Sequence, residues 1–172
     1  MTVLGSVLTV MGAALLATAQ PAAALAMLLL GTLCDTLDGQ IARAAGGGTR
    51  FGAFLDSTLD RVSDAALAVA AIQLGATLPD AVLYEGGVVL LVASFLVSYI
   101  RAKAESLGVG ATVGLAPREA RIALYLVGVA AWAITSLTWL FAAAVAVAAF
   151  LATVTVIQRL MHMSDVLSEK KG

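Results

Sequence analysis

Residues 34–60 read CDTLDGQIARAAGGGTRFGAFLDSTLD, and this stretch carries four aspartates inside a strongly apolar chain. Carboxylates bordered by apolar helices are costly unless something compensates them, so they indicate a functional site. On a helix Asp35 and Asp38 lie about 60° apart around the axis, and Asp56 and Asp60 lie about 40° apart. Because glycines at residues 46–48 interrupt the pattern, we predict two helices whose acidic faces meet across a short turn.

Anionic oxygen ligands gathered in this way suit a hard divalent cation such as magnesium or manganese. The predicted metal ligands are Asp35, Asp38, Asp56 and Asp60. Another acid, Asp64, follows Asp60 by one helical turn and lies on the same face. We interpret Asp64 as a support for the site from behind or as an ion-pair partner of Arg61.

The composition indicates an integral membrane protein. Of the 172 residues, 61% are hydrophobic and only 12% are charged, which is more apolar than a water-soluble core requires. The length allows one domain, which we assign to residues 1–172. The single cysteine, Cys34, excludes an internal disulfide and a cysteine-based metal site. We expect membrane lipids around the protein and no nucleic acid as a partner.

Apolar runs long enough to cross a membrane, each of about 20 residues, occur six times along the chain. They cover residues 2–18, 22–45, 50–78, 79–108, 117–135 and 137–162. We therefore predict an all-α membrane protein with six transmembrane helices in a single domain.

Basic residues gather at alternate ends of these runs and predict the orientation. They are Arg43, Arg50, Arg101, Lys103, Arg118, Arg121, Arg159, Lys170 and Lys171. The opposite ends carry only Asp80 and Glu85 as charged residues. Because basic segments stay on the inner side of a membrane, we predict a multi-pass protein of the cell membrane with both termini in the cytoplasm. The helical rise places both aspartate pairs near the inner leaflet, where a site can face the cytoplasm.

Small residues and one arginine lie beside the acids. Gly39, Ala42 and Gly52 leave room for a flat base or a phosphate, although such residues also serve close packing of membrane helices. Arg43 has a planar fork that suits a pyrophosphate, and its alternative role is that of a cation reaching the headgroups from a helix end. Thr49, after the glycines, belongs either to a hinge or to a group of phosphate-binding donors.

Eight positions over 26 residues form one pattern: Asp35-x2-Asp38-Gly39-x2-Ala42-Arg43-x8-Gly52-x3-Asp56-x3-Asp60. This pattern resembles the full signature of the CDP-alcohol phosphotransferase family. The resemblance implies an enzyme that moves a phosphatidyl or similar group from a CDP-linked lipid to an alcohol and releases CMP. It also implies a homodimer and two bound divalent ions in the active site.

The resemblance implies a role for each position of the pattern. Asp35, Asp38 and Asp56 would be metal ligands, with Asp35 and Asp56 bridging two ions. Asp60 would be the general base as well as a ligand. The predicted CDP-lipid site consists of Gly39, Ala42, Arg43, Thr49 and Gly52.

A second charged cluster surrounds the connection between the fourth and fifth apolar runs. Arg101 and Lys103 end the fourth run, and Arg118 and Arg121 share a helical face at the start of the fifth. The cluster either binds anionic lipid headgroups or forms a pocket for the phosphate of a phosphorylated acceptor. We predict the pocket, because the first turn of a helix also favours anions.

Residues 98–105, SYIRAKAE, and the paired arginines that follow resemble the branch of the family that makes phosphatidylinositol phosphate. We therefore expect inositol 1-phosphate as the acceptor. The chain differs from that branch in the geometry of its first basic pair and in Pro117, where an acid is more typical, so glycerol 3-phosphate stays an alternative. A remoter alternative is an ion-coupled transporter, which would distribute polar groups along a path through the membrane.

Members of the family usually carry a short amphipathic segment before the first helix, which helps to hold the nucleotide. The first apolar run begins at residue 2 in this chain. We therefore expect the chain as given to lack that N-terminal segment.

Overall fold

The described part of the chain folds into six helices. The computed structural model describes residues 2–44, 49–110 and 113–169, without the side chains of residues 2, 38–44 and 169. Within these ranges the helices are α1 (Thr2–Ala17), α2 (Pro21–Ala44), α3 (Arg50–Thr77), α4 (Ala81–Ser106), α5 (Arg118–Thr135) and α6 (Thr138–Glu169). No strand occurs in the described part of the chain. The prediction of an all-α fold built from six helices is therefore confirmed.

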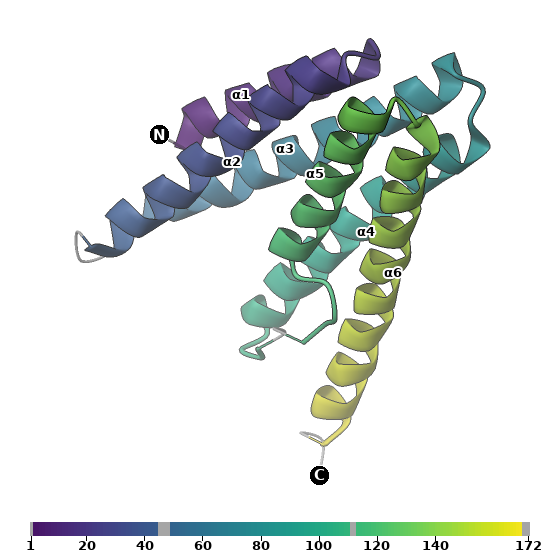
Figure 1. Ribbon diagram of the computed structural model, residues 1–172. Coiled ribbons are helices and arrows are strands. Elements are labelled where there is room, and N and C mark those ends of the chain that lie inside the picture. Colours follow the sequence, from purple (N-terminus) through teal and green to yellow (C-terminus); the bar gives the residue numbers. More distant parts are fainter. Residues whose placement is uncertain (1, 45–48, 111–112, 170–172) are drawn as a thin grey trace.

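The helices run alternately in opposite directions (Figure 1). Helix α1 packs on α2 and α3, α4 packs on α3 and α6, and α5 packs on α6 and α2. The loops that connect α1 to α2, α3 to α4 and α5 to α6 lie toward one end of the molecule. Two arms diverge away from that end, one formed by α1 and α2 and the other by α4 and α6 (Figure 1). Helix α5 thus contacts both arms and can bring their side chains together.

Among the described residues, two helices are long and apolar enough to cross a membrane, namely Ala81–Ser106 and the stretch Thr138–Ser168 of α6. Both present large apolar side chains at the surface, among them Val92 on α4 and Phe150 on α6, which are 55% and 67% exposed. Hydrocarbon rather than water is the favourable neighbour of such a surface. Helices α2 and α3 are less apolar because they carry the aspartates and arginines of the stretch 34–60. The number of crossings and the side of the termini stay predictions.

Polar side chains define where α3 and α4 begin. The hydroxyl of Thr49 accepts a hydrogen bond from the backbone N–H of Gly52 at 3.0 Å, and Asp80 accepts one from Leu83 at 3.0 Å. Each satisfies one of the backbone donors that the first turn of a helix leaves without a partner. Both caps follow a break in the apolar pattern, which is why the predicted and observed helix starts agree closely.

The last helix is longer than predicted. Helix α6 continues beyond residue 162 to Glu169, although this segment contains several polar residues. Met163 is buried against Ala104 and Val109, and Val166 packs on the same small cluster. These apolar contacts keep one face of the final turns covered and so extend the helix.

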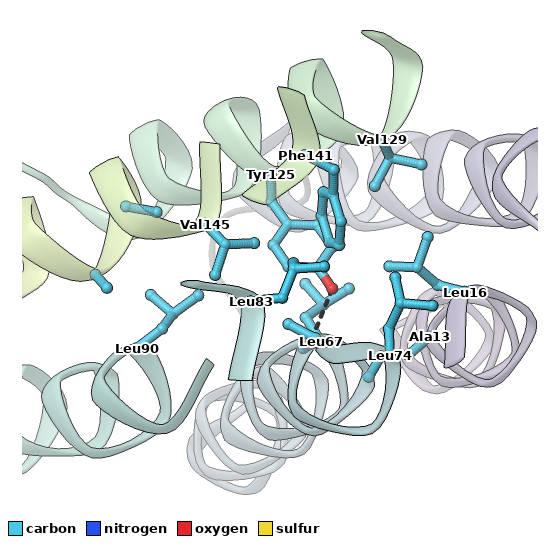
Figure 2. Close-up of a cluster of buried hydrophobic side chains, with 14 of the residues drawn as sticks. Ala13, Leu16, Leu67, Leu74, Leu83, Leu90, Tyr125, Val129, Phe141 and Val145 are labelled. Carbon is cyan, nitrogen blue, oxygen red and sulfur yellow. Dashed lines mark hydrogen bonds between the residues drawn. The ribbon is translucent and has the colours of Figure 1, made fainter. Parts of the chain in front are cut away.

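A continuous apolar core joins all six helices, and Figure 2 shows part of it. Phe141 is fully buried and meets the ring of Tyr125 edge to face, with the centroids 5.0 Å apart. It also stacks on Trp132 at 6.0 Å. The Tyr125 hydroxyl donates a 2.7 Å hydrogen bond to the carbonyl of Leu67 (Figure 2). This core determines how α5 sits against α3.

Glycines allow α1 to approach α2 closely next to the acidic stretch. A Cβ on Gly31 would lie 2.9 Å from the carbonyl oxygen of Gly5, and a Cβ on Gly5 would lie 3.4 Å from the backbone nitrogen of Asp35. Small residues are what membrane helices use for such close contacts. Helix α1 therefore braces the turn of α2 that carries Asp35.

Candidate functional site

Three aspartates converge between α2 and α3. Ligand oxygens of Asp35, Asp56 and Asp60 all lie within 4.8 Å of one another. Two carboxylate oxygens on one magnesium ion, each at about 2.1 Å, can be up to about 4.2 Å apart, so small side-chain rotations would let these groups share an ion. The donor set is all oxygen, which suits a hard divalent cation. These residues therefore fit a metal site, and the site is open, since the side chain of Asp35 is 42% exposed.

The fourth predicted ligand, Asp38, lies on α2, but its side chain is outside the described residues. The convergence of the predicted acids is thus seen for three of them.

Hydrogen bonds between α1 and α3 hold the acidic turn of α3 in place. The hydroxyls of Ser6 and Ser63 are 3.1 Å apart in a buried position, and Ser6 also donates to the carbonyl oxygen of Leu59 at 3.4 Å. Ser63 follows Asp60 by three residues. Helix α1 thus contacts both helices that supply the carboxylates.

Arg118, at the start of α5, reaches into the same group of acids. One of its terminal nitrogens, Nη1, lies 3.0 Å from Asp60 and 3.6 Å from Asp35, whereas its Nε donates to Asp64 at 3.0 Å. The side chain is 20% exposed. A residue predicted to bind the acceptor phosphate therefore also contacts the candidate metal ligands.

Asp64 supports the site from the protein interior. Its side chain is 8% exposed, and its two oxygens face Arg118 at 3.0 Å and Arg121 at 3.8 Å. Arg61 pairs instead with Asp60, at 3.4 Å. Of the two interpretations offered for Asp64, the contacts favour a supporting role, with the arginines of α5 rather than Arg61 as its partners.

A cavity of about 440 Å³ opens beside the carboxylates. We call it the arginine cavity, because five arginines line it together with acidic and small residues. The charged residues that line it are Asp56, Asp60, Arg61, Arg101, Glu105, Arg118, Glu119, Arg121 and Arg159. Three of the four predicted acceptor-binding residues are therefore found around one space, and Lys103 is not among its lining residues.

Arg159 was not predicted as a site residue. It lies on α6, is 7% exposed, and donates to the carbonyl oxygens of Val97 at 2.6 Å and Val113 at 3.0 Å. From the sequence it was counted only as a basic residue at a helix end. A signal was present, because it is the only Lys, Arg, Asp or Glu between residues 138 and 164, and a lone charge in an apolar helix indicates function.

The predicted CDP-lipid residues lie on both sides of the α2–α3 connection. Gly39, Ala42 and Arg43 belong to the last turns of α2, and their side chains are outside the described residues. Thr49 and Gly52 form the exposed start of α3, where the Thr49 hydroxyl is occupied in capping the helix. Backbone N–H groups at a helix start favour phosphate.

The fold and the site define an all-helical protein with a candidate carboxylate metal centre beside an arginine-lined cavity. The chain belongs to the CDP-alcohol phosphatidyltransferase family, whose model matches residues 1–157. This agrees with the family whose signature the sequence resembles.

Two curated relatives within this family are similar to the chain over most of its length. Archaetidylinositol phosphate synthase of Methanothermobacter thermautotrophicus is 40% identical over 138 residues, which cover 80% of this chain and 68% of the relative. Phosphatidylinositol phosphate synthase of Mycobacteroides abscessus is 40% identical over 133 residues, covering 74% of this chain and only 58% of the relative. The chain thus spans between about half and two thirds of the curated relatives it matches.

Crystal structures of phosphatidylinositol phosphate synthase from Mycobacterium tuberculosis share the fold at 33% identity. One, with CDP-DAG bound, has a TM-score of 0.84 and covers 93% of this chain and 82% of its own. Another, in complex with manganese and citrate, has a TM-score of 0.82 and covers 93% and 78%.

Proposed function

We propose that the chain is a membrane-bound transferase that moves the phosphatidyl-type group of a CDP-diacylglycerol-type lipid onto inositol 1-phosphate and releases CMP. The observation that carries the proposal is that Asp56 and Asp60 belong both to the converging carboxylates and to the wall of the arginine cavity. When the arginines of this cavity hold the phosphate of an acceptor, the hydroxyl groups of that acceptor lie next to those acids. Relatives named as inositol phosphate synthases support inositol over glycerol 3-phosphate.

The metal centre is the first part of the proposal. Asp35, Asp38, Asp56 and Asp60 would hold two magnesium or manganese ions in each active site. A bound divalent cation supplies positive charge that stabilises the negative charge of the pyrophosphate and of the departing CMP. The manganese found in the Mycobacterium tuberculosis enzyme supports this choice of metal.

Asp60 acts as the general base in the proposed reaction. It takes the proton of the acceptor hydroxyl while the hydroxyl oxygen forms a bond to the lipid-side phosphorus of the pyrophosphate. The bond between that phosphorus and the CMP oxygen breaks, and CMP leaves with the electron pair. The proton then passes from Asp60 to solvent. The neighbouring guanidinium groups of Arg61 and Arg118 keep the carboxylate oriented toward the cavity.

The arginines select a phosphorylated acceptor. Arg101, Arg118, Arg121 and Arg159 line one space, and planar guanidinium groups bind phosphate oxygens through paired hydrogen bonds. Arg121 and Arg159 are almost fully buried and already use donors on backbone carbonyls, which holds their side chains in place before the acceptor arrives. The CDP-lipid is assigned to Gly39, Ala42, Arg43, Thr49 and Gly52.

We also propose the membrane setting. The chain would be a multi-pass protein of the cell membrane with its termini and active site toward the cytoplasm, and it would act as a homodimer. The basic residues around the arginine cavity support this orientation, because such residues favour the inner side. The resemblance to the family supports the dimer.

The test is CMP release by the purified chain in detergent micelles with CDP-diacylglycerol. Inositol 1-phosphate, glycerol 3-phosphate and unphosphorylated inositol are compared with manganese, with magnesium and with a chelator. We expect metal-dependent release that is fastest with inositol 1-phosphate and weak with inositol. Faster release with glycerol 3-phosphate would contradict the acceptor, and release that survives chelation would contradict the metal centre.

A further inference from the structure

The contacts of Arg118 divide its guanidinium group between two sets of carboxylates. Nε faces Asp64, at 3.0 Å, while Nη1 faces Asp60 at 3.0 Å and Asp35 at 3.6 Å. Asp35 and Asp60 are also two of the converging acids that fit a metal ion. A positive charge at these distances opposes the binding of a cation to the same oxygens. Arg118 therefore competes with the metal unless something holds it away.

Asp64 is placed to do this. Its carboxylate is buried, and within the described residues its Oδ2 accepts no hydrogen bond, while Nη2 of Arg121 lies 3.8 Å from this oxygen. A buried carboxylate that has an oxygen without a hydrogen bond attracts nearby positive charge strongly. Asp64 thus competes with Asp60 and Asp35 for the guanidinium group of Arg118 and holds its Nε on the buried side of the site.

We infer that Asp64 is a positioning residue that competes with Asp35 and Asp60 for Arg118, so that one salt bridge tunes how tightly this site binds its divalent cation. The inference rests on the metal centre of the proposed function. It assigns a role to an acid outside the family signature. It also explains how an arginine that lines the acceptor cavity can lie so close to the metal ligands without excluding the cation.

The experiment measures manganese affinity directly, by electron paramagnetic resonance of free Mn²⁺ with the full chain in detergent and no substrate. Asp64→Asn keeps the shape and a hydrogen-bond acceptor but removes the charge that attracts Arg118. We expect the apparent Kd for Mn²⁺ to rise about tenfold, within the range of coupling between residues of one ionic network. Arg118→Gln should instead lower the Kd several-fold, because the competing charge is gone.

The double variant Asp64→Asn/Arg118→Gln separates positioning from simple loss of charge. If Asp64 acts through Arg118, the Asp64→Asn change should raise the Kd by no more than about twofold in the Arg118→Gln background, which is the direct effect of one missing charge. Glu85→Gln, an equal charge change at the far, exposed start of α4, should leave the Kd unchanged. Thermal melting of each variant checks that it is folded.

An equal rise of the Kd in both backgrounds would overturn the inference, and so would an unchanged or weaker affinity in Arg118→Gln alone. That second result applies even if Asp64→Asn does not fold. A wild-type chain that binds no Mn²⁺ would contradict the proposed metal centre and the inference together. Additive effects in a chain that binds Mn²⁺ and releases CMP would contradict the inference alone.

Discussion

Helices α3 and α5 meet at two neighbouring levels, of which one is charged and the other is apolar. At the charged level, Asp64 of α3 faces Arg118 at 3.0 Å and Arg121 at 3.8 Å. At the apolar level, one turn further along α3, the carbonyl of Leu67 accepts the hydroxyl of Tyr125 within the cluster of Figure 2. The same pair of helices thus forms part of a packed core and part of a candidate active site.

The apolar level contributes mainly to the stability of the fold, and the charged level mainly to the proposed chemistry. Buried apolar contacts stabilise the fold in proportion to the area they cover, whereas buried ion pairs repay the cost of removing charges from water only in part. Charges are kept at the charged level because a site needs them, and the packing at the apolar level holds that costly arrangement together. Variants at the two levels should therefore change different measured quantities, and four substitutions test this.

The largest effect is expected from Asp60→Asn at the charged level. Loss of the proposed general base should lower the turnover number for CMP release by about 10²–10⁴-fold, while the melting temperature falls little. Asp165→Asn, an exposed change near the end of α6, is the matched control. Wild-type turnover in Asp60→Asn would remove the distinction between a chemical and a structural level.

Phe141→Ala tests the apolar level. Its ring is fully buried between Tyr125 and Trp132, so we expect a loss of about 3–5 kcal/mol in the free energy of unfolding. Unfolding in mixed micelles with increasing SDS measures this loss. Phe150→Ala, whose ring is 67% exposed, should cost far less. Equal losses for the two would show that the cluster does not form the core.

Arg101→Gln sharpens the boundary of the charged level. Arg101 lines the arginine cavity and Lys103 does not. Removal of one charged contact to the acceptor phosphate should raise the KM for inositol 1-phosphate about tenfold, or about 1.4 kcal/mol, with the KM for the CDP-lipid unchanged. Lys103→Gln is the control, and a larger effect there would place the acceptor outside the cavity.

Tyr125→Phe should have the smallest effect of the four. It removes the 2.7 Å hydrogen bond to the Leu67 carbonyl and keeps the ring contacts, so we expect a loss of about 1 kcal/mol in unfolding free energy. Neither KM should change. A raised acceptor KM would instead mean that this hydrogen bond positions the arginines one level away.

The positions of the helices followed from local patterns. Apolar runs separated by glycine, proline and capping residues predicted all six helices, and α3 begins at Arg50 as expected. The end of α6 was missed because the contacts of Met163 with Ala104 and Val109 come from another part of the chain. Helix starts depend on neighbouring residues, whereas the extent of a frayed or polar end depends on tertiary packing.

The site was only partly predictable. Lys103 was grouped with Arg101, but residues two apart on a helix do not share a face, and only Arg101 lines the cavity. Arg159 was missed because its partners, the carbonyls of Val97 and Val113, belong to other segments. The contacts of Arg118 with the acids of α2 and α3 were likewise not predicted, because spacing along the sequence does not show which distant segments pack together.

Sequence alone determined the class of fold, the family signature and the acids that can meet between two consecutive helices, because each depends on spacing within one helix or across one short turn. Only the tertiary structure decided that Arg118 and Arg121 share Asp64, that Arg159 joins the cavity, and that the carboxylates form one of its walls. The reason is geometric, since the packing of α5 between two arms sets distances between residues more than fifty positions apart.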